Sequence, residues 1–206
     1  MQHGLYRQIF SRQISKSRAA LSIKGLVLVF LIVGCSAAHH STHIPSDRAV
    51  SVNSPGGKRY HEKVIALQTD LTDLNRQADM LEARQVAETA ITYSGNLAQD
   101  YNLVRPAILH NVFVRIGLKD RGLCYHWTED LIRRLQSLEL KTFQLHWGVA
   151  YRGSELREHN SVVITARGDA FEKGMVLDPW RNSGDLYWTL ISADRYPWKV
   201  LPPEEW

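Results

Sequence analysis

The chain has 206 residues, enough for one ordinary domain with extensions, and 44% of them are hydrophobic, enough to fill a core. Its formal net charge of +4 comes from residues 1–34, which carry five basic side chains and no acid. The remainder holds 20 basic and 21 acidic side chains, a net charge near −1. Composition therefore gives no support for a nucleic-acid partner, and we expect none.

Residues 1–34 have the parts of a bacterial signal peptide. A basic region precedes an apolar run at 25–33, which is too short for a permanent bilayer span of roughly 20 residues. The run closes on Ile-Val-Gly-Cys at 32–35, which resembles the lipobox of lipoproteins. The resemblance implies cleavage before Cys35, lipid on its thiol and attachment to a membrane. Ser36 follows instead of aspartate, which in Gram-negative lipoproteins implies the outer membrane, facing the periplasm. The alternatives are an uncleaved anchor or a chance cysteine.

Residues 35–59, rich in Ser, His, Pro and Gly, predict a flexible tether. From residue 60 onward, apolar residues recur at alternating steps of three and four, the spacing of one helix face. They are Val64, Leu67, Leu71, Leu74, Ala78 and Leu81. We expect a single helix as far as about Tyr93, stopped by Gly95-Asn96. Its apolar face either packs on the protein's own domain or binds a partner helix through residues 64–81.

The rest of the chain predicts helices and then strands. A second helix is expected over about 97–117, with Leu103, Ile108, Val112 and Ile116 on its buried face. A third opens at Cys124 and covers 128–138. Strands are expected near 142–151, 161–166 and 174–177, joined by glycine-containing turns, and residues 196–203 are expected to be irregular. This order indicates an α+β fold, with a helical arm at 60–95 and a domain at 96–206.

Cys124 is the cysteine that is available for chemistry. The chain has two cysteines, and if Cys35 is lipidated, Cys124 has no disulfide partner within it. Cys124 follows Gly122 and opens a predicted helix, whose N-terminus presents unpaired N–H groups and partial positive charge. Both favour thiolate over thiol, so Cys124 is either a reactive thiol or a buried structural cysteine.

A histidine and an aspartate downstream complete a candidate triad. His159 begins one apolar strand and Asp178 ends another. If these strands are adjacent and antiparallel, both residues lie at the same end of the sheet, where a helix can bring Cys124 to them. Cys124 is then the nucleophile, His159 the general base and acid, and Asp178 the orienting group. The alternatives are a surface histidine and a turn-starting aspartate. A zinc site from Cys124, His126 and His146 needs a convergence that nothing here predicts, so we expect no metal or other cofactor.

Three short motifs together resemble the transglutaminase-like branch of the papain-like cysteine fold, over about residues 85–190. They are Gly-Leu-Cys at 122–124, His159 at a strand start, and Val-Leu-Asp-Pro at 176–179. The resemblance implies a helix bearing the nucleophile against an antiparallel sheet bearing the histidine and aspartate. It also implies amide cleavage or acyl transfer through a thioester, without a metal. The chain departs from the pattern at Asn160, where an aromatic residue often follows the histidine. It also lacks a glutamine before the cysteine, which leaves the second oxyanion donor unassigned.

Together these features predict an exported lipoprotein with a thiol active site, acting on peptides or peptidoglycan stems in the cell envelope. The substrate class rests on location alone. The alternative is a non-catalytic envelope module on the same fold, whose residues 64–81 and exposed sheet bind a partner. A third reading, the cell-wall endopeptidases of another papain-like clan, fits less well because that clan seldom uses a late Asp-Pro such as that at Asp178.

Overall fold

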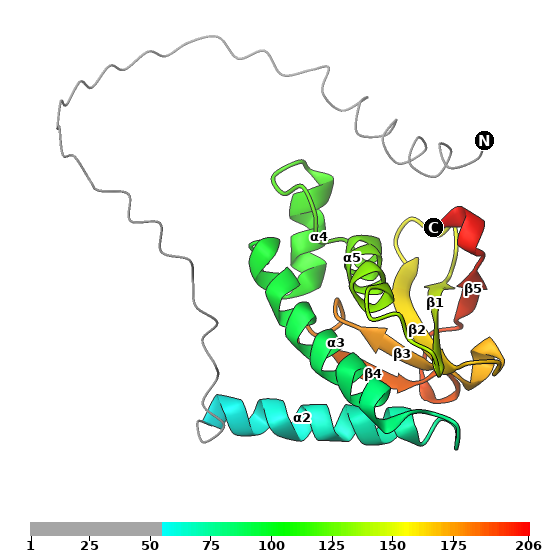
Figure 1. The fold of residues 1–206 in the computed structure, drawn as a ribbon. Helices are drawn as coiled ribbons and strands as arrows, with labels where there is room; N and C mark the ends of the chain where they lie inside the picture. The colour runs from blue at the N-terminus through cyan, green and yellow to red at the C-terminus, as the bar shows by residue number, and fades with distance from the viewer. Residues whose placement is uncertain (1–54) are drawn as a thin grey trace, which may run out of the picture.

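The computed structural model describes residues 55–206 as four α-helices and one five-stranded antiparallel sheet (Figure 1). The α+β class expected from the sequence is confirmed. The predicted signal peptide, Cys35 and the tether as far as residue 54 lie outside the described residues. Within residues 55–206, no helix is long and apolar enough to cross a membrane.

The helices precede the sheet along the chain. They are α2 (Pro55–Thr72), α3 (Met80–Asp100), α4 (Ala107–Arg115) and α5 (Cys124–Gln136). The strands are β1 (Phe143–Ala150), β2 (His159–Ala166), β3 (Met175–Asp178), β4 (Tyr187–Leu190) and β5 (Lys199–Leu201), with short 3-10 turns η1 (Phe171–Lys173), η2 (Ile191–Ala193) and η3 (Pro203–Glu205). The spatial order is β4-β3-β2-β1-β5, so the last strand returns to the edge beside β1.

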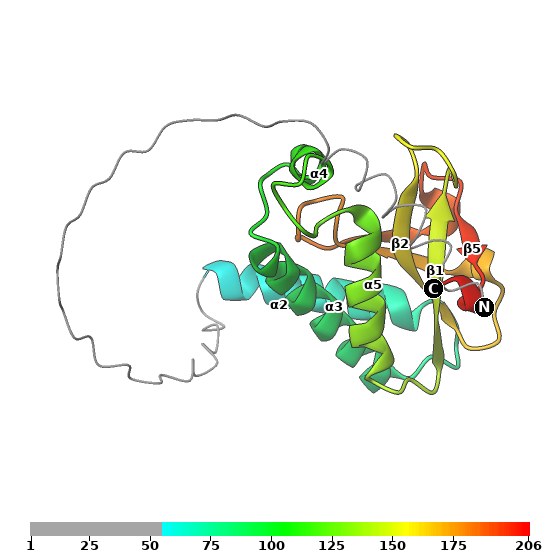
Figure 2. The same cartoon turned by 90° about the horizontal axis from the view of Figure 1, so that it is seen from above.

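Helices α2, α3 and α5 lie on one face of the sheet. In Figures 1 and 2, α5 lies against β1 and β2, α3 lies against α5, and α2 lies against α3. The spacing of apolar residues along α2 points Val64, Leu67 and Leu71 into the shared core, where each is at most 3% exposed. In the described structure, this face of α2 therefore packs on the protein's own domain.

The opposite face of the sheet carries a smaller apolar cluster. It contains Ala150, Val163, Phe171, Val176 and Trp198. Strand β2 is buried along its whole length, because β1 and β3 pair with its two edges and both of its faces are covered. The β-branched run at 162–165 suits such a central strand.

The long first helix predicted from residue 60 to Tyr93 is wrong in its extent. Helix α2 ends at Thr72. In the turn that follows, the side chain of Asn75 accepts the N–H of Gln77. Asp79 then caps α3 by accepting the N–H groups of Leu81 and Glu82. Such side-chain acceptors compete with helical hydrogen bonds and favour a restart. As a result Leu81, predicted on the buried face, is 72% exposed.

The predicted stop at Gly95-Asn96 is also wrong, because both residues lie inside α3. The helix continues to Asp100 because Ser94 and Leu97 face the core. It ends where Asn102 adopts a positive φ of 45°, a conformation that asparagine tolerates better than most residues.

The second predicted helix is shorter than expected, and its apolar face is reversed. Helix α4 is anchored by buried Ala107 and His110, while Ile108, Val112 and Ile116 are 49–62% exposed. Helix α4 lies at the margin of the molecule, away from the sheet (Figure 2). Its periodic apolar residues therefore have no sheet to cover.

The three predicted strands are confirmed as β1, β2 and β3, with ends shifted by one or two residues. The sequence did not predict β4, and the irregular end expected at 196–203 contains β5. Both strands are short and lie at the edges of the sheet. Their conformation is set by pairing with β3 and β1 and not by an apolar pattern of their own.

Candidate active site

Cys124 is the first residue of α5 and is half-buried. The turn before it requires glycine, because Gly122 has a φ of 122° and a side-chain Cβ there would lie 2.4 Å from the ring of His110. His110 is fully buried, accepts the N–H of Val104 with Nδ1 and contacts the carbonyl of Arg121 with Nε2. The imidazole thus links the loop before α4 to the turn before α5.

His126 caps the start of α5 and is not placed as a base. Its Nδ1 accepts the N–H groups of Gly122 and Leu123, at 3.1 and 3.2 Å. Burial, followed by the positive charge of Arg121, lowers the pKa of His126 to about 4. Neutral His126 therefore supplies two backbone donors with an acceptor.

This cap makes stability depend on pH. The pKa of His126 is lowered from 6.5 to about 4. The contribution of the neutral ring to the free energy of unfolding is therefore complete above pH 6.5 and is lost as pH falls toward 4. That loss amounts to about 3 kcal/mol. His126→Gln keeps a neutral acceptor of the kind found in capping boxes but does not titrate. Urea unfolding at pH 7 and pH 4 should show a loss about 3 kcal/mol smaller in the variant, and equal losses would contradict this role.

His159 and Asp178 meet at one end of the sheet, as the sequence predicted. Strands β2 and β3 are antiparallel neighbours, and Nε2 of His159 lies 2.7 Å from Oδ2 of Asp178. The two residues are 3% and 0% exposed, so His159 is not a surface histidine. Cys124 lies close enough to His159 to help raise the pKa of the imidazole, while its Sγ donates to the backbone carbonyl of Glu158 at 3.9 Å. His159 and Asp178 are thus hydrogen-bonded at the predicted sheet end, and Cys124 lies beside them.

Two charged residues that the sequence did not single out continue the hydrogen-bond network from Asp178. Arg181 donates to both carboxylate oxygens of Asp178, through its backbone N–H and its Nε. Its two terminal nitrogens lie 3.1 and 2.8 Å from the carboxylate of Asp194, which also accepts the indole N–H of Trp198. No local motif marks these positions. The available signal was a carboxylate at the end of a buried strand, which must find a cation or several donors.

The charges of this network favour the imidazolium form of His159. Burial alone would lower the pKa of His159, but the charge and hydrogen bond of Asp178, together with contact to Cys124, raise it. Burial alone would likewise raise the pKa of Asp178, but His159 and Arg181 lower it. Asp178, Arg181 and Asp194 carry a combined charge of about −1, which an imidazolium balances.

Aromatic rings enclose the histidine. Ring centroids of Trp180, Tyr196 and Trp198 lie 4.9, 4.8 and 5.4 Å from that of His159. Sequence analysis assigned no role to these residues, two of which lie in the segment expected to be irregular. The rings limit access of water to the His159–Asp178 hydrogen bond, which strengthens it electrostatically.

The residues of the alternative zinc site do not converge. His126 binds backbone N–H groups, and His146 bonds Thr165 and packs on Phe171 on the opposite face of the sheet. No group of three or more histidine, cysteine or acidic side chains in residues 55–206 is arranged to hold a metal ion.

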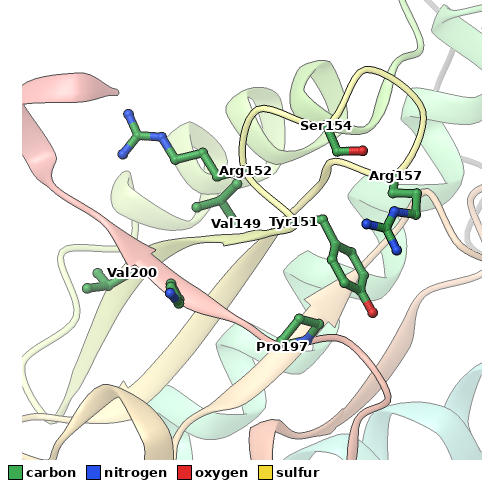
Figure 3. Close-up of a pocket in the computed structure, with 8 residues that line it drawn as sticks. Val149, Tyr151, Arg152, Ser154, Arg157, Pro197 and Val200 are labelled. Carbon is green, nitrogen blue, oxygen red and sulfur yellow. The ribbon is translucent and has the colours of Figure 1, made fainter.

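A basic hollow of about 480 Å³ borders the site (Figure 3). It is lined by Val149, Tyr151, Arg152, Ser154, Arg157, Pro197, Lys199 and Val200. Arg157 lies over the ring of Tyr151, and Tyr151 contacts Tyr196, which packs on His159. Cys124 is not part of the lining, so the hollow neighbours the reactive groups but does not contain them.

This geometry can support acyl transfer. A half-buried thiol at a helix start lies beside a buried histidine whose Nε2 is bonded to a buried carboxylate. Comparisons with protein-family models, with curated proteins and with solved structures each found no match to the chain.

Proposed function

We propose that this chain is a transglutaminase-like thiol enzyme that acts on amide bonds, by hydrolysis or acyl transfer. The observation that carries the proposal is the buried His159, whose Nε2 is bonded to Asp178 and which lies beside the half-buried thiol of Cys124. The position of Cys124 at the start of a helix that crosses an antiparallel sheet agrees with the papain-like core that the resemblance implies.

The proposed chemistry has two steps. The thiolate of Cys124 attacks the carbonyl carbon and forms an S–C bond, and the C–N bond then breaks as His159 protonates the leaving amine. This leaves a thioester on Cys124. Water or an amine, deprotonated by His159, attacks the thioester and releases the thiolate. Asp178 holds the imidazole in the tautomer that both steps need.

Alkylation of Cys124 tests the thiol–imidazole pair without a known substrate. In the wild-type chain, iodoacetamide should modify the Cys124 peptide at pH 6, where an ordinary thiol with a pKa of about 8.5 is almost wholly protonated. His159→Ala should lower this rate by at least about tenfold at pH 6. Mass spectrometry of the Cys124 peptide separates its signal from that of Cys35.

His146→Ala is the matched control, because this histidine bonds Thr165 and packs on Phe171 and takes no part in the His159–Asp178 hydrogen bond. It should leave the pH profile unchanged. If Cys124 reacts only near pH 8 and above, and reacts equally with and without His159, the proposal fails. The chain would then be better described as a non-catalytic envelope module.

We further propose that the protein works in the cell envelope, held to a membrane by lipid on Cys35. The support is the basic region, short apolar run and lipobox-like end of residues 1–35. Peptides or peptidoglycan stems are then the accessible amide substrates. Cys35→Ser should move the protein from the membrane fraction to the soluble fraction of cell lysates. If the variant stays with the membrane, lipid on Cys35 is not the anchor.

A further inference from the structure

Asn160 is a buried polar side chain beside Cys124 that the proposed triad does not use. It is 5% exposed and follows His159 on β2, opposite Val149 of β1. Its Nδ2 lies 3.9 Å from Sγ of Cys124. Because β2 alternates its side chains, His159 and Asn160 approach the thiol from the two faces of one strand end.

The orientation of this amide is determined by a tryptophan. Nε1 of Trp147 lies 2.8 Å from Oδ1 of Asn160, and an indole N–H can only donate. The amide oxygen must therefore face Trp147, which places the NH₂ group toward Cys124. One of its two N–H groups can reach Oε1 of Glu158 at 3.4 Å, and the other is directed at the thiol. Trp147 is itself 8% exposed within the core.

Attack by Cys124 on a carbonyl creates a negative oxygen that needs hydrogen-bond donors next to the sulfur. The backbone N–H of Cys124 is one donor, because the first N–H groups of a helix have no intrahelical acceptor. A second donor must lie on the same side of the sulfur, and the Nδ2–H group of Asn160 is the side-chain donor in contact with Sγ.

We propose that Asn160 supplies the second donor of an oxyanion hole, with the backbone N–H of Cys124 as the first, and that Trp147 is its positioning residue. As the S–C bond forms, the carbonyl π electrons move onto oxygen, and both donors bind that charge. When the C–N bond breaks, the charge returns to the carbonyl. This inference rests on the proposed function.

Two electrophiles separate this role from a purely structural one. Iodoacetamide alkylates sulfur by direct displacement and forms no tetrahedral oxyanion, whereas p-nitrophenyl acetate acylates sulfur through one. Asn160→Ala should lower the single-turnover release of p-nitrophenolate about 10²- to 10³-fold, the usual effect of losing one oxyanion donor. Its iodoacetamide rate at pH 6 should fall far less, because alkylation forms no oxyanion and loses only the 3.9 Å contact of Nδ2 with the sulfur.

Trp147→Phe provides a second variant that leaves the Asn160 side chain in place. It removes the indole N–H that orients the amide, so acylation should fall about tenfold while alkylation is unchanged. Trp188→Phe is the matched control. Trp188 lies on the edge strand β4, and its indole N–H donates to Asp70 at 2.8 Å instead of to Asn160. This control should leave both rates unchanged.

The outcomes that overturn the inference are distinct from those that overturn the proposed function. Acylation that is unchanged in Asn160→Ala, or acylation and alkylation that fall together, would reduce Asn160 to a packing role. A wild-type protein that alkylates rapidly but releases no p-nitrophenolate would have the ion pair and no working oxyanion hole. A thiol indifferent to His159 would remove the proposed function, and this inference with it.

Discussion

Replacing Asp178 with Asn is expected to lower acyl transfer by Cys124 on the order of 10⁴-fold and to destabilise the fold by about 3 kcal/mol. Oδ2 of Asp178 accepts from both His159 and Arg181, and Oδ1 accepts the backbone N–H of Arg181. An amide has one oxygen, so its NH₂ group would face donors. When that NH₂ group faces His159, Nε2 becomes the acceptor and the proton moves to Nδ1, so the imidazole no longer has the tautomer that accepts a proton from Cys124.

The loss of stability has a separate cause. Arg181 remains beside a site that no longer carries a carboxylate, and removing one partner of a buried ion pair leaves the other charge uncompensated. Because the pKa of Asp178 is lowered, its stabilising contribution is present above its ordinary value of 3.8 and is lost as pH falls below it. The stability gap between wild type and variant should therefore narrow in acid.

Asp194→Asn is the matched control for Asp178→Asn. Asp194 lies in the same network, with its side chain 1% exposed, but it contacts Arg181 and Trp198 instead of His159. It should lower the free energy of unfolding while changing p-nitrophenyl acetate turnover less than about tenfold. Chemical denaturation and ester turnover separate the two effects. Equal losses of turnover in both variants would contradict a direct role for Asp178.

Gly122→Ala is expected to destabilise the protein by about 2–4 kcal/mol and to remove most of the reactivity of Cys124. The new Cβ would lie 2.4 Å from two atoms of the His110 ring, and the φ of 122° is strained for any residue with a side chain. His110 is held on both of its nitrogens and cannot move freely. The strain therefore falls on the turn that places Cys124.

Gly168→Ala isolates the contribution of the clash. Gly168 also has a positive φ, of 87°, but a Cβ added there would have no other atom within 4 Å. This variant should cost about 1 kcal/mol, and its Cys124 alkylation rate should equal that of wild type. Urea unfolding and iodoacetamide kinetics on both variants provide the comparison. If the two substitutions have equal costs, His110 does not constrain the turn.

The meeting of Cys124, His159 and Asp178 could be predicted because each residue ends or begins an element with a clear local pattern. The apolar runs around His159 and Asp178 predict strands, and antiparallel pairing of neighbouring strands places both at one sheet end. Gly122 marks the turn before Cys124. Order along the chain and strand polarity were therefore sufficient for the main geometry of the site.

The supporting residues could not be predicted in the same way. Three of them, Trp147, Arg181 and Asp194, reach the site across long sequence separations or from turns without periodicity. In addition, the sequence pattern does not show which way a polar side chain points. Asn160 was visible only as a departure from the family pattern. Its orientation depends on the indole of Trp147 in the neighbouring strand.

By itself the sequence determined the α+β class, the buried face of α2, the three inner strands and the three residues that meet in the candidate site. Those features depend on local periodicity and chain order. Tertiary structure alone decided the break between α2 and α3, the outward apolar face of α4, the edge strands β4 and β5, and the network behind His159. The reason is physical: these features depend on which surfaces and hydrogen-bond partners remain available after the sheet and helices have packed.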